Sequence, residues 1–379
     1  MSMKVNVLGV GMTKFGELWE KSVFDLALEA SLKAIEDSKI DAKKIEAIFV
    51  ANMLSSKLDG QDHLGSVVAG LLGLNVSASR VEGACASGGL AIHAGVAAIL
   101  SGLYETVLVV GTEKMTDASL CEITTALMGA GSEEERLSGL TFPALYALMA
   151  RSHMEQFGTT REQMAQVAVK NHFHASLNDK AHFPFAVSVE KVLGSPDICY
   201  PFTLFDASPV SDGAAAVVLT KKSVKKGITI TGSAVATDTI GLAKRESLTE
   251  LAATKKACEA ALQQSGVSLV DIDVLEVHDC FTIAEIMAME DLGFCAKGEG
   301  GQFIASGSTK LGSRIPVNTS GGLKACGHPV AATGIKQIVE IVHQLRGNTG
   351  ARQVAGAKVG LTHNVGGTGA TVVIHVLEK

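Results

Sequence analysis

The sequence Arg80-Val-Glu-Gly-Ala-Cys85-Ala-Ser-Gly-Gly-Leu-Ala-Ile-His-Ala-Gly-Val-Ala-Ala-Ile-Leu-Ser101-Gly102 is the stretch that decides the fold class of this chain. One cysteine lies among small residues and is followed by about four turns of sequence without Asp, Glu, Lys or Arg. A helix that is apolar on every face is typical of the middle of a large core. We therefore predict a buried central helix that begins near Cys85.

Cys85 would lie at the N-terminus of that helix, where unpaired amides and the helix dipole favour a thiolate. The dipole contributes at most about 2 kcal/mol, which corresponds to roughly one and a half pKa units. Because a free thiol has a pKa of about 8.5, a histidine would be needed to complete the activation. The alternative interpretation is a core cysteine, since free cysteines are among the most buried residues.

Length and composition limit the class of protein. The chain has 379 residues, of which 47% are hydrophobic and 4% aromatic, with 40 glycines. This length is enough for two or three domain-sized units. The net charge of −6 argues against a nucleic-acid or anionic-membrane surface. The seven cysteines lack zinc-ligand spacing. No secretory or membrane-spanning segment is recognisable, so we expect a cytoplasmic location with free thiols.

Strand-like and helix-like segments alternate in the first half of the chain, which implies a parallel or mixed sheet covered on both faces. The segments are strands at Val5–Leu8, Ile45–Ala51 and Thr106–Val110, and helices at Asp25–Asp37 and Gly65–Leu72.

A similar order recurs in the second half, which indicates a duplication. Ile272–His278 resembles Ile45–Ala51, and each half closes with a similar strand, at Asp212–Val218 and at Gly367–Val373. About 100 residues intervene before the first of these closing strands. We predict an N-terminal half (1–112 with 211–226), an inserted loop domain (113–210) and a C-terminal half (227–379).

The two central helices also correspond. Both end in Leu-x-Gly, at Gly102 and Gly347, so that Cys85 and the turn that contains His328 occupy equivalent helix starts. Two related α/β halves should pack about a pseudo-twofold axis, which brings together the loops at the C-terminal ends of their strands. These loops contain Cys85, His278–Phe281, His328 and His363–Gly369.

The chain resembles the thiolase superfamily, specifically its archaeal and sterol-carrier-type branch, essentially over its whole length. The matching motifs are Cys85-Ala-Ser-Gly88, His278-Asp-Cys-Phe281, Asn318-Thr-Ser-Gly-Gly322 with Gly327-His328-Pro329, and His363-Asn-Val-Gly366. The resemblance implies a five-layered α-β-α-β-α fold, a coenzyme A thioester substrate, and a homodimer or homotetramer. It implies no metal or redox cofactor, because coenzyme A is itself a substrate.

Cleavage or formation of a carbon–carbon bond between thioesters needs a nucleophile that is also a leaving group, and Cys85 can supply it. The resemblance implies that His328 activates Cys85; a histidine that merely starts a helix beside Pro329 is the alternative. Better-known thiolases carry a second cysteine in a Cys-x-Gly motif near the C-terminus. Here that place reads Asn364-Val-Gly366, so the resemblance assigns the acid/base role to Cys280, with a small buried residue as the alternative.

The remaining candidates would bind oxygen or shape loops. His278 is expected to form one oxyanion hole, and the amides of Cys85 and Gly366 a second one. His363 lies in the same loop as a possible further donor, and Asn318 is expected to shape its loop. Cys326 is predicted to fill a small slot in the packing.

We therefore predict a thiolase that exchanges 3-ketoacyl-CoA plus CoA with two acyl-CoAs, most simply acetoacetyl-CoA with acetyl-CoA, in lipid and mevalonate metabolism. The alternatives are a ketoacyl synthase, a retro-aldol lyase, or a partner-dependent subunit. The partners implied for the last are a hydroxymethylglutaryl-CoA synthase and a small zinc-ribbon/OB-fold protein.

Overall fold

The centre of the fold is a nine-stranded mixed sheet, in a computed structural model that describes residues 4–223 and 227–379. Its strands in chain order are β1 (Val5–Met12), β2 (Ala47–Ala51), β3 (Ser77–Val81), β4 (Thr106–Glu113), β7 (Gly213–Thr220), β8 (Ile228–Thr237), β9 (Val274–Glu276), β10 (Val359–Gly366) and β11 (Thr371–Glu378). Their order across the sheet is β3-β2-β4-β7-β1-β8-β11-β10-β9.

The pairing of the strands confirms the predicted duplication. In the first half, β2 runs parallel to β4, and β7 runs antiparallel to both β4 and β1. In the second half, β9 runs parallel to β10, and β11 runs antiparallel to both β10 and β8. The halves join where Val5–Val7 of β1 pairs with Ile228–Ile230 of β8. The basic connection Lys221–Lys226 lies just before this junction, and residues 224–226 of it are outside the described part.

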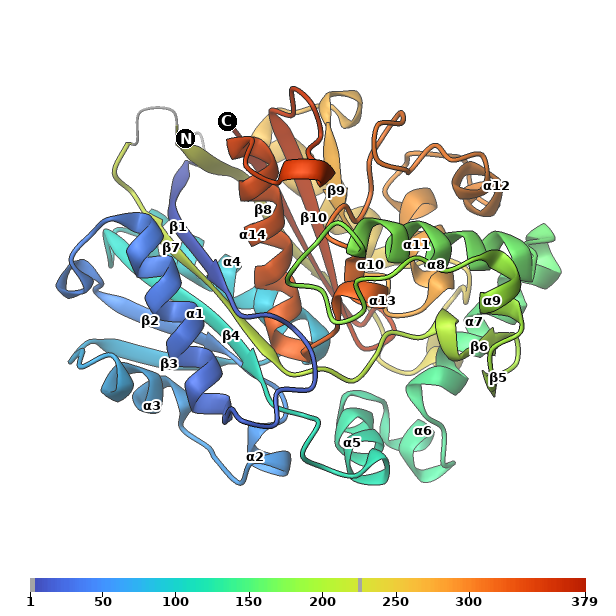
Figure 1. Cartoon of the computed structure of the whole chain (residues 1–379), viewed down its shortest axis with the longest axis horizontal. Coiled ribbons are helices and arrows are strands. Elements are labelled where there is room, and N and C mark those ends of the chain that lie inside the picture. The colour runs from blue at the N-terminus through green and yellow to red at the C-terminus, as the bar shows by residue number, and fades with distance from the viewer. Residues whose placement is uncertain (1–3, 224–226) are drawn as a thin grey trace.

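Helices cover both halves in the predicted five layers. The two central helices, α4 (Ser87–Leu100) and α14 (Thr333–Arg346), pack against each other between the two halves of the sheet (Figure 1). The outer helices are α1 (Val23–Ser38) and α3 (Leu64–Leu71) on the first half, and α10 (Ala252–Ser265) and α11 (Thr282–Asp291) on the second. Three separate hydrophobic clusters fill the spaces between these layers.

The expectation that α4 is buried on every face is wrong for the single chain. Ala97 and Leu100 are exposed, and Leu100 keeps 45% of its surface. The reason is that β3 is an edge strand of the sheet, so that among the described residues no further strand extends the sheet over this side of α4. A shallow hollow between α4, β2 and β3 is lined by Phe49, Ala94 and Tyr104 among others.

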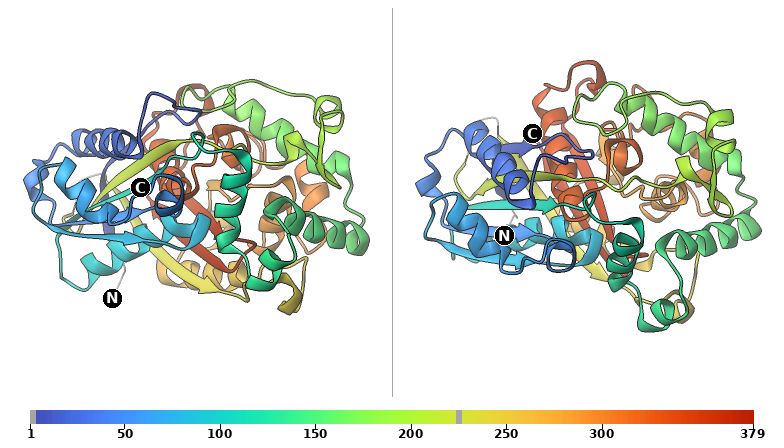
Figure 2. Two further views of the ribbon diagram at one scale, coloured as in Figure 1. Left: turned by 90° about the horizontal axis from the view of Figure 1, so that it is seen from below. Right: turned by 60° about the horizontal axis from the view of Figure 1, so that its bottom comes forward.

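The segment between β4 and β7 lies against the C-terminal half, as Figures 1 and 2 show in green beside orange and red. Its elements are α5 (Leu120–Leu127), α6 (Glu133–Leu137), α7 (Phe142–Phe157), α8 (Arg161–Ala175), α9 (Val189–Leu193) and a hairpin of β5 (Asp197–Cys199) and β6 (Phe202–Thr203). Its division from the halves at residues 112/113 and 210/211 stays a prediction.

Short helices complete the loops: α2 (Ser55–Leu58), α12 (Gly300–Ala305) and α13 (Gly322–Cys326), and the 3₁₀ turns η2 (Ala84–Ala86) and η7 (Val330–Ala332). η2 directly precedes α4, and η7 directly precedes α14, so the two predicted helix starts correspond in the structure. Within residues 4–223 and 227–379 there is no helix with the length and apolar character needed to cross a membrane.

Candidate active site

Three side chains from three separate loops meet beside the start of α4. Cys85 lies in η2, His278 follows β9, and His328 lies between α13 and η7. The Cys85 sulfur and one ring nitrogen of each histidine all lie within 4.8 Å of one another. The imidazole rings are nearly perpendicular, with centroids 5.3 Å apart. The structure therefore brings together three of the four residues predicted to be catalytic.

Cys85 is held in a strained turn. The preceding residue, Ala84, has a φ of +52°, a region that residues with a side chain rarely adopt. The Cys85 carbonyl accepts a hydrogen bond from Asn364 Nδ2 at 3.0 Å, and Asn364 Oδ1 accepts one from the Gly89 amide at 3.0 Å. Gly88 allows the two central helix starts to approach, because a Cβ there would lie 2.7 Å from the Ala331 carbonyl oxygen.

The expectation that the helix start favours a Cys85 thiolate is not met. Burial raises the pKa of the Cys85 thiol to about 12, against opposing hydrogen bonds from the backbone of Gly367 and of Cys85 itself. The Glu113 carboxylate at the end of β4 adds to the increase in pKa. Cys85 therefore rests as a neutral thiol and needs a base at the moment of attack.

His328 has the tautomer that such a base requires. The Thr333 hydroxyl donates to the Pro329 carbonyl at 3.1 Å and lies 2.7 Å from His328 Nδ1. Since a hydroxyl has only one proton to donate, it must accept the second bond from an Nδ1–H. The lone pair of His328 is then on Nε2. Burial lowers the pKa of His328 to about 3, with a smaller contribution from Lys336, so this ring is neutral and can accept a proton.

The environment of His278 selects the opposite arrangement. Asn364 Nδ2 lies 3.5 Å from His278 Nδ1, and this amide group is a donor because its oxygen is occupied by Gly89. His278 Nδ1 is therefore the acceptor, and Nε2 carries the proton. Nε2 is buried and has no partner among the described residues. A buried N–H without a partner at this place is suited to bind a substrate oxygen.

Cys280, the fourth predicted catalytic residue, is close enough to Cys85 for the charges of the two groups to interact. It is buried, with 7% of its surface exposed. Burial holds the pKa of its thiol well above the ordinary value, and hydrogen bonding with Tyr146 opposes this increase. The neighbouring charge of Cys85 would also raise the pKa of Cys280. At rest Cys280 is a neutral thiol that can donate a proton.

The turn after β10 approaches Cys85 closely. A Cβ on Gly366 would lie 2.5 Å from the Gly83 carbonyl oxygen, so the motif requires a glycine there. It is the backbone of Gly367, one residue further along than predicted, that forms a hydrogen bond with the Cys85 thiol. This turn can therefore direct an amide at the reacting group. The role of the Gly366 amide itself stays a prediction.

His363 is not among the three residues whose sulfur and ring nitrogens meet at the cluster. Neighbouring residues on a strand face opposite sides of the sheet; Asn364 faces η2 and α4, whereas His363 Nε2 lies 3.0 Å from the Thr254 hydroxyl of α10. His363 is near enough to His278 to lower the pKa of that ring, and its role as a further donor stays a prediction.

Asn318 has the contacts of a loop-shaping residue, as the sequence predicts. Its φ is +56°, its Oδ1 accepts from the Val277 amide at 2.9 Å, and its Nδ2 donates to Glu285 at 2.8 Å. Cys326 is fully buried in a small cluster of Phe15 and alanines, which agrees with its predicted role as a packing residue.

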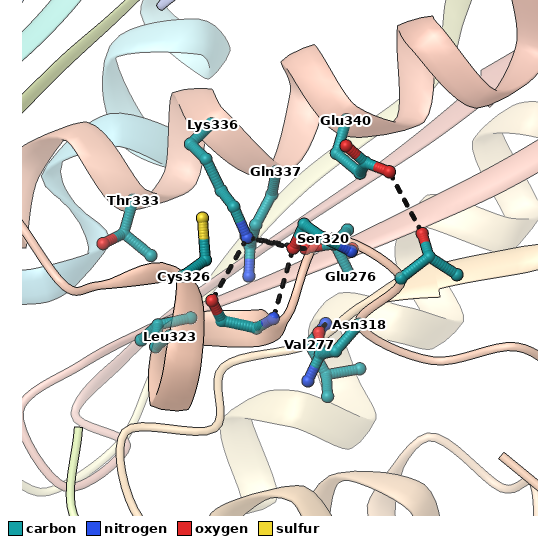
Figure 3. A network of polar contacts seen from close by, with 12 residues as sticks. Glu276, Val277, Asn318, Ser320, Leu323, Cys326, Thr333, Lys336, Gln337 and Glu340 are labelled. Atoms are coloured by element: carbon teal, nitrogen blue, oxygen red, sulfur yellow. Dashed lines mark hydrogen bonds and ion pairs between the residues drawn. The ribbon is translucent and has the colours of Figure 1, made fainter. Parts of the chain in front are cut away.

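A buried ion pair connects the loops that contain the two histidines (Figure 3). Lys336 of α14 lies 2.9 Å from Glu276, which is two residues before His278. Glu276 also accepts hydrogen bonds from the hydroxyl and the amide of Ser320, at 2.6 and 3.1 Å. Asp279 supplies a second connection, since it accepts from the Leu323 amide at the start of α13 at 2.6 Å. These contacts fix His278 relative to His328.

Several residues at the site were not singled out by the sequence: Asn364, Thr333, Glu113 and Tyr146. Glu113 accepts bonds from the Leu54 and Ala331 amides, and burial raises its pKa to about 7. All four residues have weak signals in the sequence, because each acts by orienting a partner from another loop. A thiol and two imidazoles are also ligand types that suit a transition metal. Among the described residues, Cys85, His278 and His328 form a group whose ligand atoms lie close enough together to hold one.

Comparison with known proteins identifies the family that this fold and site define. Residues 5–191 match the model of the thiolase N-terminal domain, and residues 234–379 match that of the thiolase C-terminal domain-like family. The chain belongs to the thiolase family, and it is an acyltransferase of that family.

Similar proteins carry three kinds of name: acetyl-CoA acetyltransferase, sterol carrier protein and aldolase. An acetyl-CoA acetyltransferase from Methanothermobacter thermautotrophicus is 48% identical, with 99% of each chain covered, and one from Methanocaldococcus jannaschii is 45% identical, with 99% of this chain and 98% of the other covered. Human sterol carrier protein 2 is 33% identical over 98% of this chain and 71% of its own length. A solved Ltp2-ChsH2(DUF35) aldolase is 25% identical, has a TM-score of 0.85, and covers 99% of this chain and 98% of its own.

Proposed function

We propose that this protein is a thiolase that interconverts acetoacetyl-CoA plus CoA with two molecules of acetyl-CoA through an S-acetyl Cys85. The observation that carries the proposal is the meeting of Cys85 with a His328 whose Nε2 is a free base and a His278 whose Nε2–H is a free donor. The full-length relatives named acetyl-CoA acetyltransferase support the two-carbon acyl group.

The first half-reaction uses all three groups and Cys280. The Cys85 sulfur attacks the ketone carbon of acetoacetyl-CoA as its proton moves to His328 Nε2. When the tetrahedral adduct collapses, the carbon–carbon bond breaks and leaves an acetyl thioester on Cys85. The electron pair goes to the departing acetyl-CoA enolate, whose carbon takes the proton of Cys280. A neutral thiol at Cys280 is the state that this protonation requires.

The second half-reaction restores the enzyme. The Cys280 thiolate takes the proton of the CoA thiol, and the CoA sulfur attacks the acetyl group on Cys85. Collapse of this second adduct releases acetyl-CoA, and the proton held on His328 returns to the Cys85 sulfur. The atoms and protons balance without a metal or a redox cofactor, with coenzyme A as substrate.

Two donors can stabilise the oxyanions that form in these steps. His278 Nε2–H is buried and free to bind the thioester oxygen of the enolate. The amides at Cys85 and in the Gly366–Gly367 turn are suited to the oxygen of the tetrahedral adducts. Removal of one oxyanion donor typically lowers the rate about 10²- to 10³-fold, which is the effect we expect for His278→Ala.

Thiolysis of acetoacetyl-CoA by the purified chain tests the proposal. We expect an active wild type, an acetyl adduct on Cys85 by intact-mass and peptide mass spectrometry, and loss of turnover in Cys85→Ala and Cys280→Ala. Cys326→Ala is the matched control, because this cysteine packs in a separate small cluster with Phe15 and alanines. Full activity in Cys280→Ala would remove Cys280 from the mechanism, and an inert wild type would contradict the proposed function.

A partner-dependent activity is the second candidate. The solved Ltp2-ChsH2(DUF35) aldolase, which this chain resembles in fold, favours it. Under this alternative the chain would be inert alone and would gain activity with a zinc-ribbon/OB-fold protein or a hydroxymethylglutaryl-CoA synthase. A retro-aldol lyase or a ketoacyl synthase is less well supported, because Cys85 and Cys280 together fit thiolysis.

We also propose that the chain is a homodimer, or a homotetramer built from dimers, in the cytoplasm. The exposed side of α4 with Ala97 and Leu100 lies beside the unpaired edge strand β3, and both features need a partner surface. A second copy can cover both at once in a closed twofold contact.

A further inference from the structure

The turn that joins β10 to β11 directs the Gly367 amide at Cys85, yet its own sequence is poorly suited to holding a fixed shape. It is Gly366-Gly367-Thr368-Gly369, and Gly367 and Gly369 have φ values of +62° and +110°. Glycines reach such angles easily but also leave them easily, because they have no side chain to restrict the backbone. Something outside the turn must fix it if the amide is to stay in place.

Tyr146 of α7 holds the first half of this turn. Its hydroxyl donates to the Gly367 carbonyl at 2.9 Å, and its side chain is 2% exposed. Its ring is stacked on Phe281 at a centroid distance of 4.8 Å, and Phe281 is stacked in turn on Phe202 at 5.2 Å. Phe281 directly follows Cys280, so Tyr146 connects the turn with the second cysteine.

Arg245 holds the second half. Its Nε donates to the Thr239 carbonyl at 2.9 Å, while its two terminal nitrogens donate to the Thr368 carbonyl at 2.5 Å and the Thr368 hydroxyl at 3.0 Å. Within the described part of the chain, no carboxylate lies within ion-pair distance of this guanidinium. Its two terminal nitrogens are directed to the turn while Nε anchors the guanidinium to Thr239, and the rigid fork of arginine is suited to this use.

We propose that Tyr146 and Arg245 are positioning residues that clamp the Gly366–Gly369 turn and so keep the Gly367 amide on the reacting group at Cys85. The inference rests on the proposed thiolase function and adds two residues to its machinery. Neither residue needs to exchange protons with substrate. Burial holds the pKa of the Tyr146 hydroxyl well above its ordinary value, so it remains a donor.

The duplication explains why the clamp comes from outside the turn. In the C-terminal half the strands β10 and β11 are joined by this short turn, whereas in the N-terminal half the equivalent strands β4 and β7 are joined by the long inserted segment. Tyr146 belongs to that segment. The long segment between β4 and β7 thus supplies Tyr146, and Tyr146 holds the equivalent turn between β10 and β11 in the other half.

The test compares Tyr146→Phe, Arg245→Lys and the double variant with wild type in acetoacetyl-CoA thiolysis. Tyr146→Phe keeps the stacked ring, and Arg245→Lys keeps the charge. We expect kcat to fall about 10- to 100-fold in each single variant, below the full loss of an oxyanion donor, with KM within about threefold of wild type. Tyr146→Phe also removes the hydrogen bond with Cys280, so the double variant should be little worse than Tyr146→Phe, because both substitutions release one turn.

Matched controls are Tyr200→Phe, on an exposed tyrosine of the same inserted segment, and Arg151→Lys, on an exposed position of α7. Both should keep wild-type kcat. Rescue of Arg245→Ala by millimolar guanidinium would support a local positioning role. Wild-type kcat in Tyr146→Phe and Arg245→Lys, or losses that merely follow a lowered Tm, would overturn the clamp.

A second readout separates the clamp from the proposed function. The hydrogen bond between the Gly367 backbone and the Cys85 thiol lowers the pKa of that thiol, so a displaced turn should slow alkylation of Cys85 by iodoacetamide at pH 8, measured by peptide mass spectrometry, by at least about threefold. If the wild type is inert in thiolysis, the proposed function fails. The rate of Cys85 alkylation alone then tests whether Tyr146 and Arg245 clamp the turn. An unchanged alkylation rate in Tyr146→Phe would then overturn it.

Discussion

At the scale of single residues, the site depends on which nitrogen of each histidine carries a proton. Thr333 leaves Nε2 of His328 as a base, and Asn364 leaves Nε2 of His278 as a donor. Two chemically identical side chains therefore take opposite roles within 4.8 Å of the same sulfur. Thr333 acts through the ring that it orients, and Asn364 acts through the His278 ring and the Cys85 carbonyl.

Thr333→Val should lower kcat/KM for thiolysis by about 10- to 100-fold, a range typical of the loss of positioned general-base catalysis. Valine keeps the shape of threonine but cannot accept from His328 Nδ1, so the base tautomer is no longer selected. Thr333→Ser should restore most of the activity, and steady-state kinetics on the three proteins provides the comparison. Wild-type activity in Thr333→Val would show that the His328 ring is oriented by other contacts.

The pH dependence of Cys85 alkylation follows from its raised pKa. With a thiol pKa of about 12 and a His328 pKa of about 3, the resting pair is neutral over the physiological range. The thiolate fraction then increases about tenfold per pH unit below the thiol pKa, so the iodoacetamide rate should rise steadily from pH 7 to pH 9. A plateau near neutral pH would instead reveal a preformed thiolate–imidazolium pair.

At the scale of elements, the site depends on how closely two helix starts approach and on how the loops around them are connected. Gly88 at the start of α4 contacts the backbone of η7, and no larger residue fits. The Lys336–Glu276 pair fixes α14 to the end of β9, next to His278. The Gly88 contact joins the two halves of the duplication, and the Lys336–Glu276 pair joins two layers of the C-terminal half. Both contacts therefore position catalytic groups.

Gly88→Ala should destabilise the fold by about 1–3 kcal/mol, the usual cost of overpacking a core. The added Cβ would lie 2.7 Å from the Ala331 oxygen and 2.9 Å from the Gly334 nitrogen, both of which are backbone atoms. Gly70→Ala in α3 is the matched control, because nothing lies within 4 Å of that Cβ. It should stabilise the protein by about 0.5–1 kcal/mol, and denaturant unfolding of both variants measures the contrast.

Lys336→Met should be strongly destabilising, by about 3–5 kcal/mol, because it leaves the fully buried Glu276 without its cation. The double variant Lys336→Met with Glu276→Gln should recover part of that loss, since no uncompensated charge then remains. Chemical denaturation of the two variants gives the comparison. A double variant that is less stable than Lys336→Met would contradict this account of the pair.

At the scale of the whole molecule, five layers are formed from two copies of one α/β unit, and the inserted segment breaks their symmetry. The reacting groups come from the N-terminal half (Cys85) and the C-terminal half (His278, Cys280 and His328). The exposed side of α4 shows that the layers of one chain are not closed at the β3 edge.

Leu100→Glu should weaken the proposed dimer, because it places a charge on the apolar side of α4 that lies beside β3. Light scattering coupled to size-exclusion chromatography should show a dimer or tetramer for wild type and a shift towards monomer for the variant. Leu137→Glu is the control, on a leucine that is 81% exposed on α6. A monomeric wild type would rule out the proposed oligomer.

The sequence by itself determined the duplicated α/β architecture, the two corresponding helix starts, and Cys85, His278, Cys280 and His328 as the candidate catalytic set. The architecture and the helix starts follow from local patterns, namely a charge-free helix after one cysteine and a recurring order of strands and helices. The roles of His328 and Cys280 were implied by the resemblance of their motifs to the thiolase superfamily.

Only the tertiary structure decided the protonation of Cys85, the tautomers of the histidines, and the parts played by Tyr146 and Arg245. The physical reason is that each depends on groups distant in sequence: burial that disfavours a thiolate, a hydroxyl that selects one ring nitrogen, and side chains that hold a glycine turn. The same reason separates His363 from its motif neighbour, since strand pleating directs the His363 ring to Thr254 of α10 and the Asn364 amide to the Cys85 carbonyl.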